Sequence, residues 1–377
     1  MQPRLSVGVF FLFVALPLFA RGEKPQVTGT ITTDSGNPRN TEGSFVTLRD
    51  GSVLYIYSRF VGATVGDHTT GHLASCLLPS KGKAWLQNDE PVFSREGKQN
   101  DMSVSLLRLA DGRIALFYAV KNSLQDCRMR MRTSSDEGKT WSKPVDCMSG
   151  EMNYFVVNND RVIQTKSGRL IIPAAAHVRD GKWETAADLV CFLSDDAGKT
   201  WRRGKRMLAG FREDGLRYTT QEPGVVQLRD GRIMLWCRTD IGTQSVAYSE
   251  DEGETFSQLE PWNFRSPRAP ASIKRIPATG DLLLVWNDSF DKSQGHSGKR
   301  TPLCTAISRD EGATWEHERT LESDPNGWFC YTAIHFIEDR VLLAYWLADP
   351  AGLSRGIGTR ITEVPVDWFY QEPDAVP

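Results

Sequence analysis

A short motif, Ser-x-Asp-x-Gly-x-Thr followed by an aromatic residue, occurs four times in this chain of 377 residues. The copies end at Trp141, Trp201, Phe256 and Trp315, and a weaker copy, LPSKGKAW, ends at Trp85. The five aromatic residues are therefore 56, 60, 55 and 59 residues apart. A catalytic site is rarely built four times, whereas a period of this length indicates a fold made of repeated structural units.

Each repeat also contains a second signature, in which two apolar runs flank a tight turn. The turns are centred on Gly51, Gly112, Gly168, Gly231, Gly280 and Asp339. Asp-Gly between β-rich runs, as in VTLRDGSVLYIY, is a strong hairpin signal. Six hairpins without helical periodicity predict an all-β fold, a six-bladed β-propeller with Asp-box repeats. We expect a strand near residues 27–32 to close the ring by pairing with the final segment GIGTRITEV.

The boxes themselves are predicted to be scaffold. Within SDDAGKTW, the carboxylate of Asp196 is suited to accept backbone N–H groups in a turn, and Gly198 tolerates a positive φ. Thr200 can bond locally, and the aromatic Trp201 is expected to pack between blades. The adjacent acidic residues therefore indicate a turn and not a catalytic pair.

The N-terminal residues predict a signal peptide. Arg4 precedes an apolar run from Val7 to Phe19, and polarity returns directly after Ala20. A membrane anchor is the alternative, but the run is shorter than the roughly 20 residues of a spanning helix, and Pro17 interrupts it. We expect residues 1–20 to be removed and residues 25–377 to form a single propeller domain, periplasmic or extracellular, with no stable membrane insertion.

Charge and cysteine content exclude several classes of partner. The formal net charge is -2, which provides no general attraction to nucleic acid. The seven cysteines show no CxxC spacing, so neither a metal site nor a cofactor is predicted. Cys127 and Cys147 bracket a repeat and are candidates for a disulfide in an oxidising compartment. Cysteines inside apolar runs, such as Cys191, Cys237 and Cys304, are expected to be buried thiols.

The boxes and hairpins together resemble the sialidase (neuraminidase) superfamily, whose six-bladed propellers carry Asp boxes on the rim opposite the active site. The resemblance covers nearly the whole mature chain. It implies a pocket in which three arginines bind the substrate carboxylate. It also implies an aspartate acid/base and a tyrosine nucleophile that is assisted by a glutamate.

The register of the boxes assigns most of these roles. The resemblance implies Tyr331 in WFCYTAIHF as the nucleophile, Glu222 in TTQEPGVV as its helper base, and Asp67 in VGATVGDHTT as the acid/base. It implies Arg238 and Arg300 as two of the three arginines. A neutral tyrosine avoids the repulsion that the substrate carboxylate would exert on an anionic nucleophile, and a raised pKa would help the acid/base. The structural alternatives are a core tyrosine and arginines paired with nearby carboxylates.

One position departs from the resemblance. The first arginine of the superfamily precedes the first hairpin turn, and the corresponding position in RNTEGSFVTLRDG holds Glu42. An anion there would repel a substrate carboxylate. Either Arg39 or Arg59 replaces the missing cation, or the substrate is not an ordinary sialoside.

A second polar cluster opens the third hairpin. It contains Asn158, Asn159, Asp160 and Arg161, and His177 follows in the same hairpin. Asn159, Arg161 and His177 are candidates for contacts with sugar hydroxyls. The alternative is that Asn and Asp shape a turn and His177 bonds a neighbouring strand.

The predicted function is a secreted, exo-acting, retaining glycoside hydrolase of the sialidase type, with a glycan or glycoconjugate substrate. Two alternatives stay open. The first is a propeller hydrolase that acts on a glycoside without sialic acid, and the second is a propeller that binds carbohydrate without cleaving it.

Overall fold

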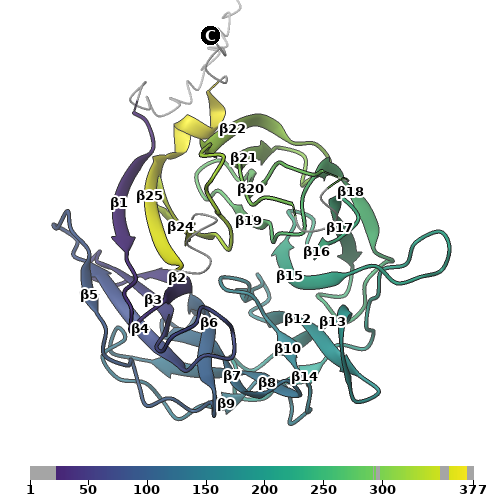
Figure 1. Ribbon diagram of the computed structural model, residues 1–377, viewed down its shortest axis with the longest axis horizontal. Coiled ribbons are helices and arrows are strands. Elements are labelled where there is room, and N and C mark those ends of the chain that lie inside the picture. The colour runs from purple at the N-terminus through teal and green to yellow at the C-terminus, as the bar shows by residue number, and fades with distance from the viewer. Residues whose placement is uncertain (1–22, 292, 294–297, 349–355, 372–377) are drawn as a thin grey trace, which may run out of the picture.

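Antiparallel groups of strands surround a central axis (Figure 1), which is the arrangement of a six-bladed β-propeller and confirms the predicted fold. The strands form four hydrogen-bonded sheets, because one parallel pairing joins the first blade to the second, and another joins the third to the fourth. The computed structural model describes residues 23–291, 293, 298–348 and 356–371. The predicted signal peptide, residues 1–20, lies outside them. No described helix is both long and apolar enough to span a bilayer.

The blades follow one another along the chain. Blade 1 contains β2 (Arg39–Thr47), β3 (Val53–Phe60), β4 (Gly71–Leu78) and β5 (Leu86–Asn88), and blade 2 contains β6 (Asn100–Arg108), β7 (Ile114–Ser123), β8 (Asp126–Ser134) and β9 (Val145–Asp146). Blade 3 contains β10 (Phe155–Val156), β11 (Ile163–Gln164), β12 (Leu170–Arg179), β13 (Lys182–Ser194) and β14 (Arg202–Arg203), and blade 4 contains β15 (Thr220–Gln227), β16 (Ile233–Thr239), β17 (Thr243–Ser249) and β18 (Glu260–Arg265). Blade 5 contains β19 (Ser272–Arg275), β20 (Leu282–Asn287), β21 (Leu303–Ser308) and β22 (Glu316–Glu322), and blade 6 contains β23 (Ala333–Ile337), β24 (Arg340–Leu347), β25 (Gly358–Pro365) and the N-terminal strand β1 (Gln26–Ile31). A 3-10 helix, η2 (Val366–Tyr370), follows β25.

The two ends of the described chain close the ring. Strand β1 pairs antiparallel with β25, and Ile31 lies opposite Thr359. The outer strand of blade 6 is therefore N-terminal, whereas the other three strands of this blade are C-terminal. This pairing confirms the predicted closure.

The hydrophobic core is divided among the interfaces between blades. Phe117 of blade 2 and Phe192 of blade 3 share one cluster with the box aromatic Trp201. Phe256 packs in the next cluster, between blades 3 and 4. The prediction that box aromatics pack between blades is confirmed. All seven cysteines are buried and free, so the candidate pair Cys127 and Cys147 forms no disulfide.

The Asp boxes form turns, as predicted. The Oδ1 atom of Asp196 accepts hydrogen bonds from the Ser194 hydroxyl and the Thr200 backbone N–H, both at 2.9 Å. Its Oδ2 atom accepts the Thr200 hydroxyl at 2.6 Å, and the Gly198 N–H donates to Ser194 Oγ. Asp136, Asp251 and Asp310 accept the corresponding bonds in their own boxes.

Replacing Asp196 with alanine should therefore lower stability and leave the pocket unaffected. Loss of its turn bonds should cost about 1 kcal/mol or more of unfolding free energy, which chemical denaturation can measure. Asp195→Ala is the matched control, because Asp195 is 52 % exposed and its carboxylate forms ion pairs with Arg169 and Arg202 at the surface. An Asp196→Ala protein that loses activity but not stability would contradict this prediction.

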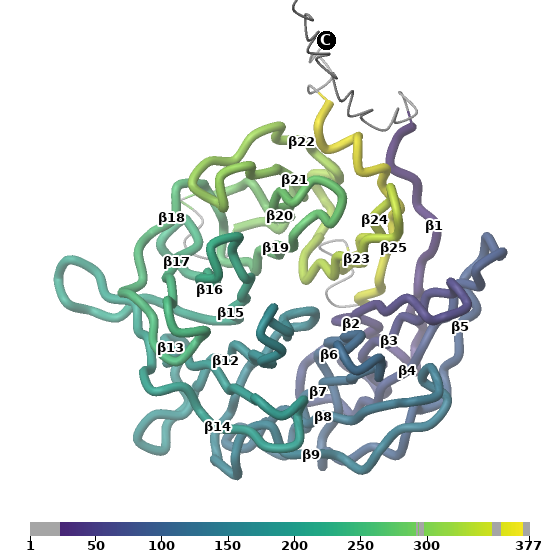
Figure 2. Tube along the Cα trace, turned by 180° about the vertical axis from the view of Figure 1, so that it is seen from behind, coloured from purple at the N-terminus to yellow at the C-terminus, as the bar shows by residue number. Residues whose placement is uncertain are grey.

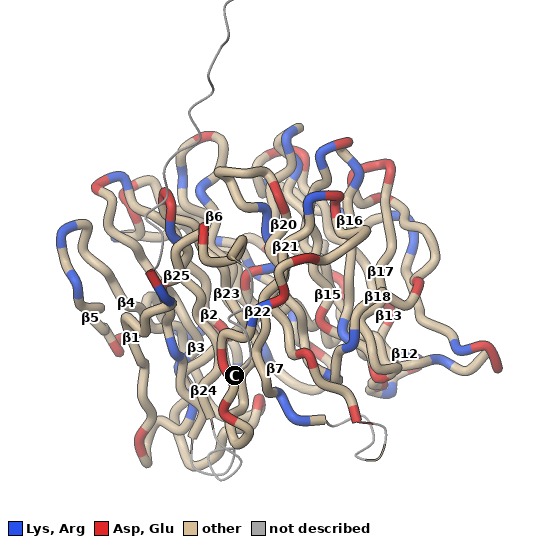
Figure 3. Tube along the Cα trace, turned by 90° about the horizontal axis from the view of Figure 1, so that it is seen from above, with Lys and Arg blue, Asp and Glu red and all other residues tan. Residues whose placement is uncertain are grey.

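The inner edge of blade 3 differs from that of the other blades. Its first strand is broken into β10 and β11, and residues 157–162 between them lie near the axis of the ring (Figure 2). This axial segment, residues 157–162, therefore provides side chains that can reach several blades at once. Along the rest of the described chain, positive and negative residues are interspersed (Figure 3).

Candidate active site

A pocket of about 300 Å³ opens at the centre of the ring. Its glutamates Glu42 and Glu222 lie in the first halves of the inner strands β2 and β15, and Arg238 lies near the end of β16. The hairpin turns and boxes lie at the other ends of these blades. The pocket therefore occupies the face opposite the boxes. Its charged lining residues are Arg39, Glu42, Asp67, Glu222, Arg238 and Arg300.

An unusual backbone conformation aims several side chains into this pocket. Glu42, Ser103, Glu222 and Tyr331 all have positive φ angles, between 49° and 57°. Glu42, Ser103 and Glu222 lie on the inner strands of blades 1, 2 and 4, each at a register shift. Each of these residues comes nine residues before the glycine of its hairpin turn. A left-handed conformation costs a non-glycine residue on the order of 1 kcal/mol, and such strain is concentrated at functional sites. The spacing could have identified Ser103, which sequence reasoning missed.

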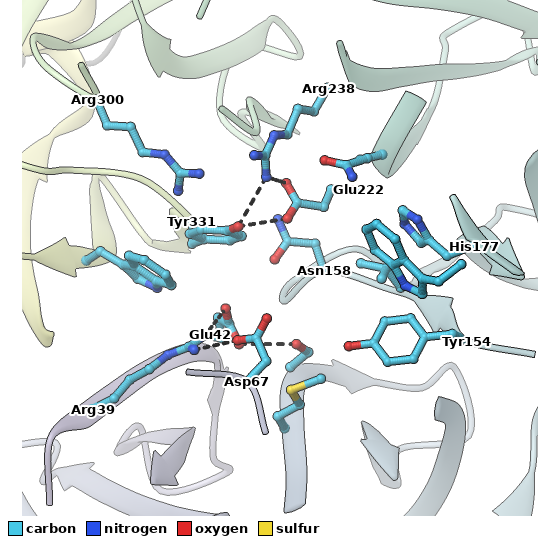
Figure 4. A pocket seen from close by; sticks show the side chains of 16 residues that line it. Arg39, Glu42, Asp67, Tyr154, Asn158, His177, Glu222, Arg238, Arg300 and Tyr331 are labelled. Carbon is cyan, nitrogen blue, oxygen red and sulfur yellow. Dashed lines mark hydrogen bonds and ion pairs between the residues drawn. The ribbon is translucent and has the colours of Figure 1, made fainter. Parts of the chain in front are cut away.

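Tyr331, Glu222 and Arg238 form one hydrogen-bonded group (Figure 4). The Tyr331 hydroxyl donates to Glu222 Oε1 at 2.7 Å. Arg238 donates to Glu222 Oε2 at 2.8 Å and to the Tyr331 hydroxyl oxygen at 3.4 Å. The tyrosine ring is stacked on Trp346, with ring centroids 4.5 Å apart. The three residues come from blades 4 and 6, and the structure brings them together as the sequence predicted.

The charges in this group hold a proton on the tyrosine. Burial raises the pKa of Glu222, but Arg238 outweighs this effect and lowers its pKa below the usual value. Burial and the negative charge of Glu222 together raise the pKa of Tyr331, while Arg300 and Arg238 oppose them. Glu222 is therefore ionised and directly hydrogen-bonded to a neutral phenol. This geometry places a carboxylate within reach of the phenol proton, as nucleophilic catalysis by a tyrosine would require.

Arg300 is the cation in the pocket that is not paired with a carboxylate among the described residues. Its guanidinium donates to Cys330 Sγ at 2.8 Å and lies 5.2 Å from the centroid of the Tyr331 ring. Arg238, by contrast, is already paired with Glu222. Arg300 is therefore the arginine most readily available to an incoming anion.

Arg39, and not Arg59, is the arginine that the first blade contributes to the pocket in place of the one missing at position 42. Arg39 lines the pocket and is almost fully buried. It donates to Glu42 Oε1 at 2.6 Å and to Asp67 Oδ1 at 2.5 Å. Arg59 points elsewhere, where it pairs with Asp89 and donates to Asn37. The pocket thus has three arginines after all, but Glu42 accompanies the first of them.

Asp67 and Glu42 share Arg39, but the pKa values of their carboxyl groups shift in opposite directions. Enclosure raises the pKa of Asp67, but its ion pair with Arg39 outweighs this and lowers the pKa, so the expected raised value is corrected for the ligand-free protein. The Asp67 side chain is also 53 % exposed, which limits the effect of enclosure. The pKa of Glu42 is raised above its usual value. Burial is the main cause and the charges of Asp67 and Glu222 add to it, while Arg39 opposes the rise.

Most polar side chains of the axial segment bond to other blades and do not face the pocket. Asn159 donates from Nδ2 to the backbone oxygens of Gly43 and Tyr331, and Arg161 donates to the Ala271 carbonyl and the Ser272 hydroxyl. Neither side chain lines the pocket, so the structure does not place Asn159 or Arg161 where a sugar would contact them. Their bonds join blade 3 to blades 1, 5 and 6.

Asn158 differs from its two neighbours. It lines the pocket, it is only 2 % exposed, and its Nδ2 atom has no hydrogen-bond partner among the residues that the structure describes. A buried donor without a partner is costly. Asn158 is therefore a better candidate for a substrate contact than Asn159.

An aromatic wall completes the pocket. His177 lines it, is stacked on Trp183 with centroids 4.8 Å apart, and is hydrogen-bonded through Nδ1 to the Glu184 carbonyl. Burial lowers the pKa of His177 and favours the neutral ring. Tyr154 lies edge-on to both rings. Trp183 is 42 % exposed, so part of its surface is free for a ligand. Sequence reasoning missed Tyr154 and Trp183, because neither lies in a box or at a hairpin turn.

The comparisons with known proteins agree with the fold. The sequence matches the BNR repeat-like domain family over residues 73–342. The sialidase of Micromonospora viridifaciens is 26% identical over 224 residues, which cover 54% of this chain and 31% of that protein. The sialidase of Paraclostridium sordellii is 21% identical over 238 residues, which cover 56% of each chain. The chain thus matches 31% of the length of the first relative and 56% of the length of the second.

Two solved structures have the same architecture. A protein of unknown function from Dyadobacter fermentans gives a TM-score of 0.71 at 22% identity, covering 91% of this chain and 99% of that one. A mutant of the NanB sialidase from Streptococcus pneumoniae gives a TM-score of 0.68 at 14% identity, covering 93% of this chain and 72% of that one. With the repeats and the family match, these likenesses show that the chain belongs to the BNR repeat-like domain family of the sialidase superfamily.

Proposed function

We propose that the protein is a retaining, exo-acting glycoside hydrolase of the sialidase type. The observation that carries this proposal is the 2.7 Å hydrogen bond from the Tyr331 hydroxyl to the buried, ionised Glu222, with Arg238 beside both groups. A core tyrosine has no need of an adjacent carboxylate base in a left-handed backbone conformation. The similarity of the chain to two bacterial sialidases supports the same class of reaction.

In the first step, Tyr331 transfers its proton to Glu222 while its oxygen bonds to the anomeric carbon. The bond from that carbon to the leaving oxygen breaks, and Asp67 protonates the leaving oxygen. In the second step, Asp67 takes a proton from water, and the water oxygen bonds to the anomeric carbon. The bond to Tyr331 then breaks, and Glu222 returns the proton to the phenol. Two displacements give net retention.

The substrate proposed for this pocket is a sugar that carries a carboxylate on its anomeric carbon, as sialic acid does. Arg300 is available to it, and Arg39 and Arg238 complete a set of three planar donors. A carboxylate that binds Arg39 would compete with Asp67 for the same guanidinium. Loss of that ion pair would raise the pKa of Asp67 and favour the protonated acid that the first step needs.

Glu42 favours a second candidate substrate, a glycoside without a carboxylate. Three arginines and three carboxylates line the pocket, so their formal charges cancel. The wild-type protein should therefore be assayed against chromogenic sialosides and neutral hexosides. Release from sialosides supports the first substrate class, and release from neutral glycosides alone supports the second. Binding without release from any substrate would favour a propeller that only binds carbohydrate.

Replacing Glu42 with glutamine tests the charge argument directly. Removal of one negative charge beside Arg39 should lower KM for a carboxylated substrate roughly tenfold, while KM for a neutral glycoside stays unchanged. Steady-state kinetics at neutral pH measures both values. A higher KM for the carboxylated substrate would contradict this, and would mean that Glu42 chiefly orients Arg39.

A further inference from the structure

A fully buried lysine lies behind the loop that carries Asp67. Lys121 is in β7 and is 0 % exposed. Its Nζ donates to the Asp67 backbone oxygen at 2.9 Å and to the Tyr154 hydroxyl at 2.8 Å. Among the described residues, no carboxylate forms an ion pair with the Lys121 ammonium group. Its hydrogen bond to Asp67 is to the backbone oxygen and not to the carboxylate. Burying an ammonium group without a paired carboxylate is expensive, so such a lysine beside a pocket indicates a function.

The Asp67 loop depends on a few such contacts. Most residues from 61 to 70 are exposed, and the loop lies outside the strands. Asn100 Nδ2 donates to the backbone oxygens of Asp67 and Thr69, at 2.8 and 2.9 Å. The Asp67 carbonyl is therefore held by two buried donors, of which Lys121 alone can carry a charge. Arg39 holds the opposite side of the loop through the Val65 carbonyl and the Asp67 carboxylate.

We propose that Lys121 is a positioning residue for Asp67: its ammonium group fixes the acid/base loop through the Asp67 carbonyl and adds a positive charge to that of Arg39 beside this loop. This inference rests on the proposed role of Asp67. The charged and titratable groups facing Asp67 are Arg39 and Glu42 from β2, His68 from its own loop and Lys121 from β7. Cys127 and Tyr154 also face Lys121.

The matched pair of variants is Lys121→Met and Asn100→Ala. Each removes one donor to the Asp67 carbonyl, but only Lys121→Met can remove a charge. Both should lower kcat at least tenfold, because a displaced acid/base costs that much or more. The distinguishing readout is the pKa of Asp67, measured without substrate by NMR titration of protein with labelled aspartate carboxyl carbons. Asp67→Asn identifies the signal.

The pKa of Asp67 should rise in Lys121→Met and stay at the wild-type value in Asn100→Ala. Lys121→Gln, which keeps a donor without the charge, should reproduce the rise and replaces Lys121→Met if that variant does not fold. An unchanged pKa in the lysine variants, or the same rise in Asn100→Ala, would overturn the inference. If the wild type cleaves no glycoside, the proposed function fails, but the titration still reports on Lys121.

Discussion

Tyr331→Phe should lose glycoside cleavage almost entirely, with kcat/KM falling by at least three orders of magnitude. The change removes one oxygen atom, which is the atom proposed to bond to the anomeric carbon. The ring stays in place against Trp346, so the pocket keeps its shape and its arginines. Steady-state kinetics measures the loss, and calorimetry with a substrate or product should show binding within a few-fold of wild type.

The matched control for this variant is Tyr345→Phe in the same blade. The Tyr345 hydroxyl bonds to Glu322 and Thr362 and does not line the pocket. Its removal should cost stability and leave kcat unchanged. If Tyr331→Phe retained more than a tenth of wild-type activity while Tyr345→Phe behaved as expected, Tyr331 would not be the nucleophile.

Asp67→Asn should produce the second-largest effect, and its size should depend on the leaving group. General acid catalysis contributes typically 10² to 10⁴ in rate, so cleavage of a natural glycoside with a poor leaving group should fall by about that factor. A glycosyl fluoride or nitrophenyl glycoside needs little protonation and should lose far less in the first step. Comparing kcat/KM for the two kinds of substrate, which reports the steps through the first irreversible one, measures this difference.

The pH dependence of the same variant provides a second readout. The proposed first step needs protonated Asp67, and Arg39 lowers the pKa of this residue in the free protein. Wild-type kcat/KM should therefore fall as the pH rises above that pKa. Asp67→Asn should remove this decline. His68→Asn, in the same loop, should retain it. An equal loss of activity on all substrates, with the decline still present, would exclude Asp67 as the acid.

The repeats made much of the pocket predictable from sequence. The box register located Tyr331, Glu222, Arg238, Arg300 and Asp67, because each lies at a fixed position within a blade and the ring brings equivalent positions together. The same register placed Glu42 at the first arginine position. The structure shows why that alignment was incomplete: a register shift between Thr41 and Ser44 adds one residue to the inner strand, and Arg39, which precedes this shift, also reaches the pocket.

Side-chain direction and long-range bonding could not be read in this way. Asn159 and Arg161 lie in an axial segment whose bonds cross the ring, and nothing local distinguishes them from Asn158, which does line the pocket. The lowered pKa of Asp67 depends on Arg39, which is distant in sequence. Lys121 is an ordinary strand residue until its burial and its bond to the Asp67 carbonyl are known.

The most direct test of the proposed mechanism is to trap the glycosyl intermediate. The reagent is a fluoride of the sugar that the glycoside assay identifies, with a second fluorine beside the anomeric carbon to slow hydrolysis of the intermediate. Mass spectrometry of the treated protein should show the addition of one sugar, and peptide mapping should locate it on Tyr331. An adduct on another residue, or turnover of the fluoride with no adduct in wild type and undiminished turnover in Tyr331→Phe, would contradict the mechanism.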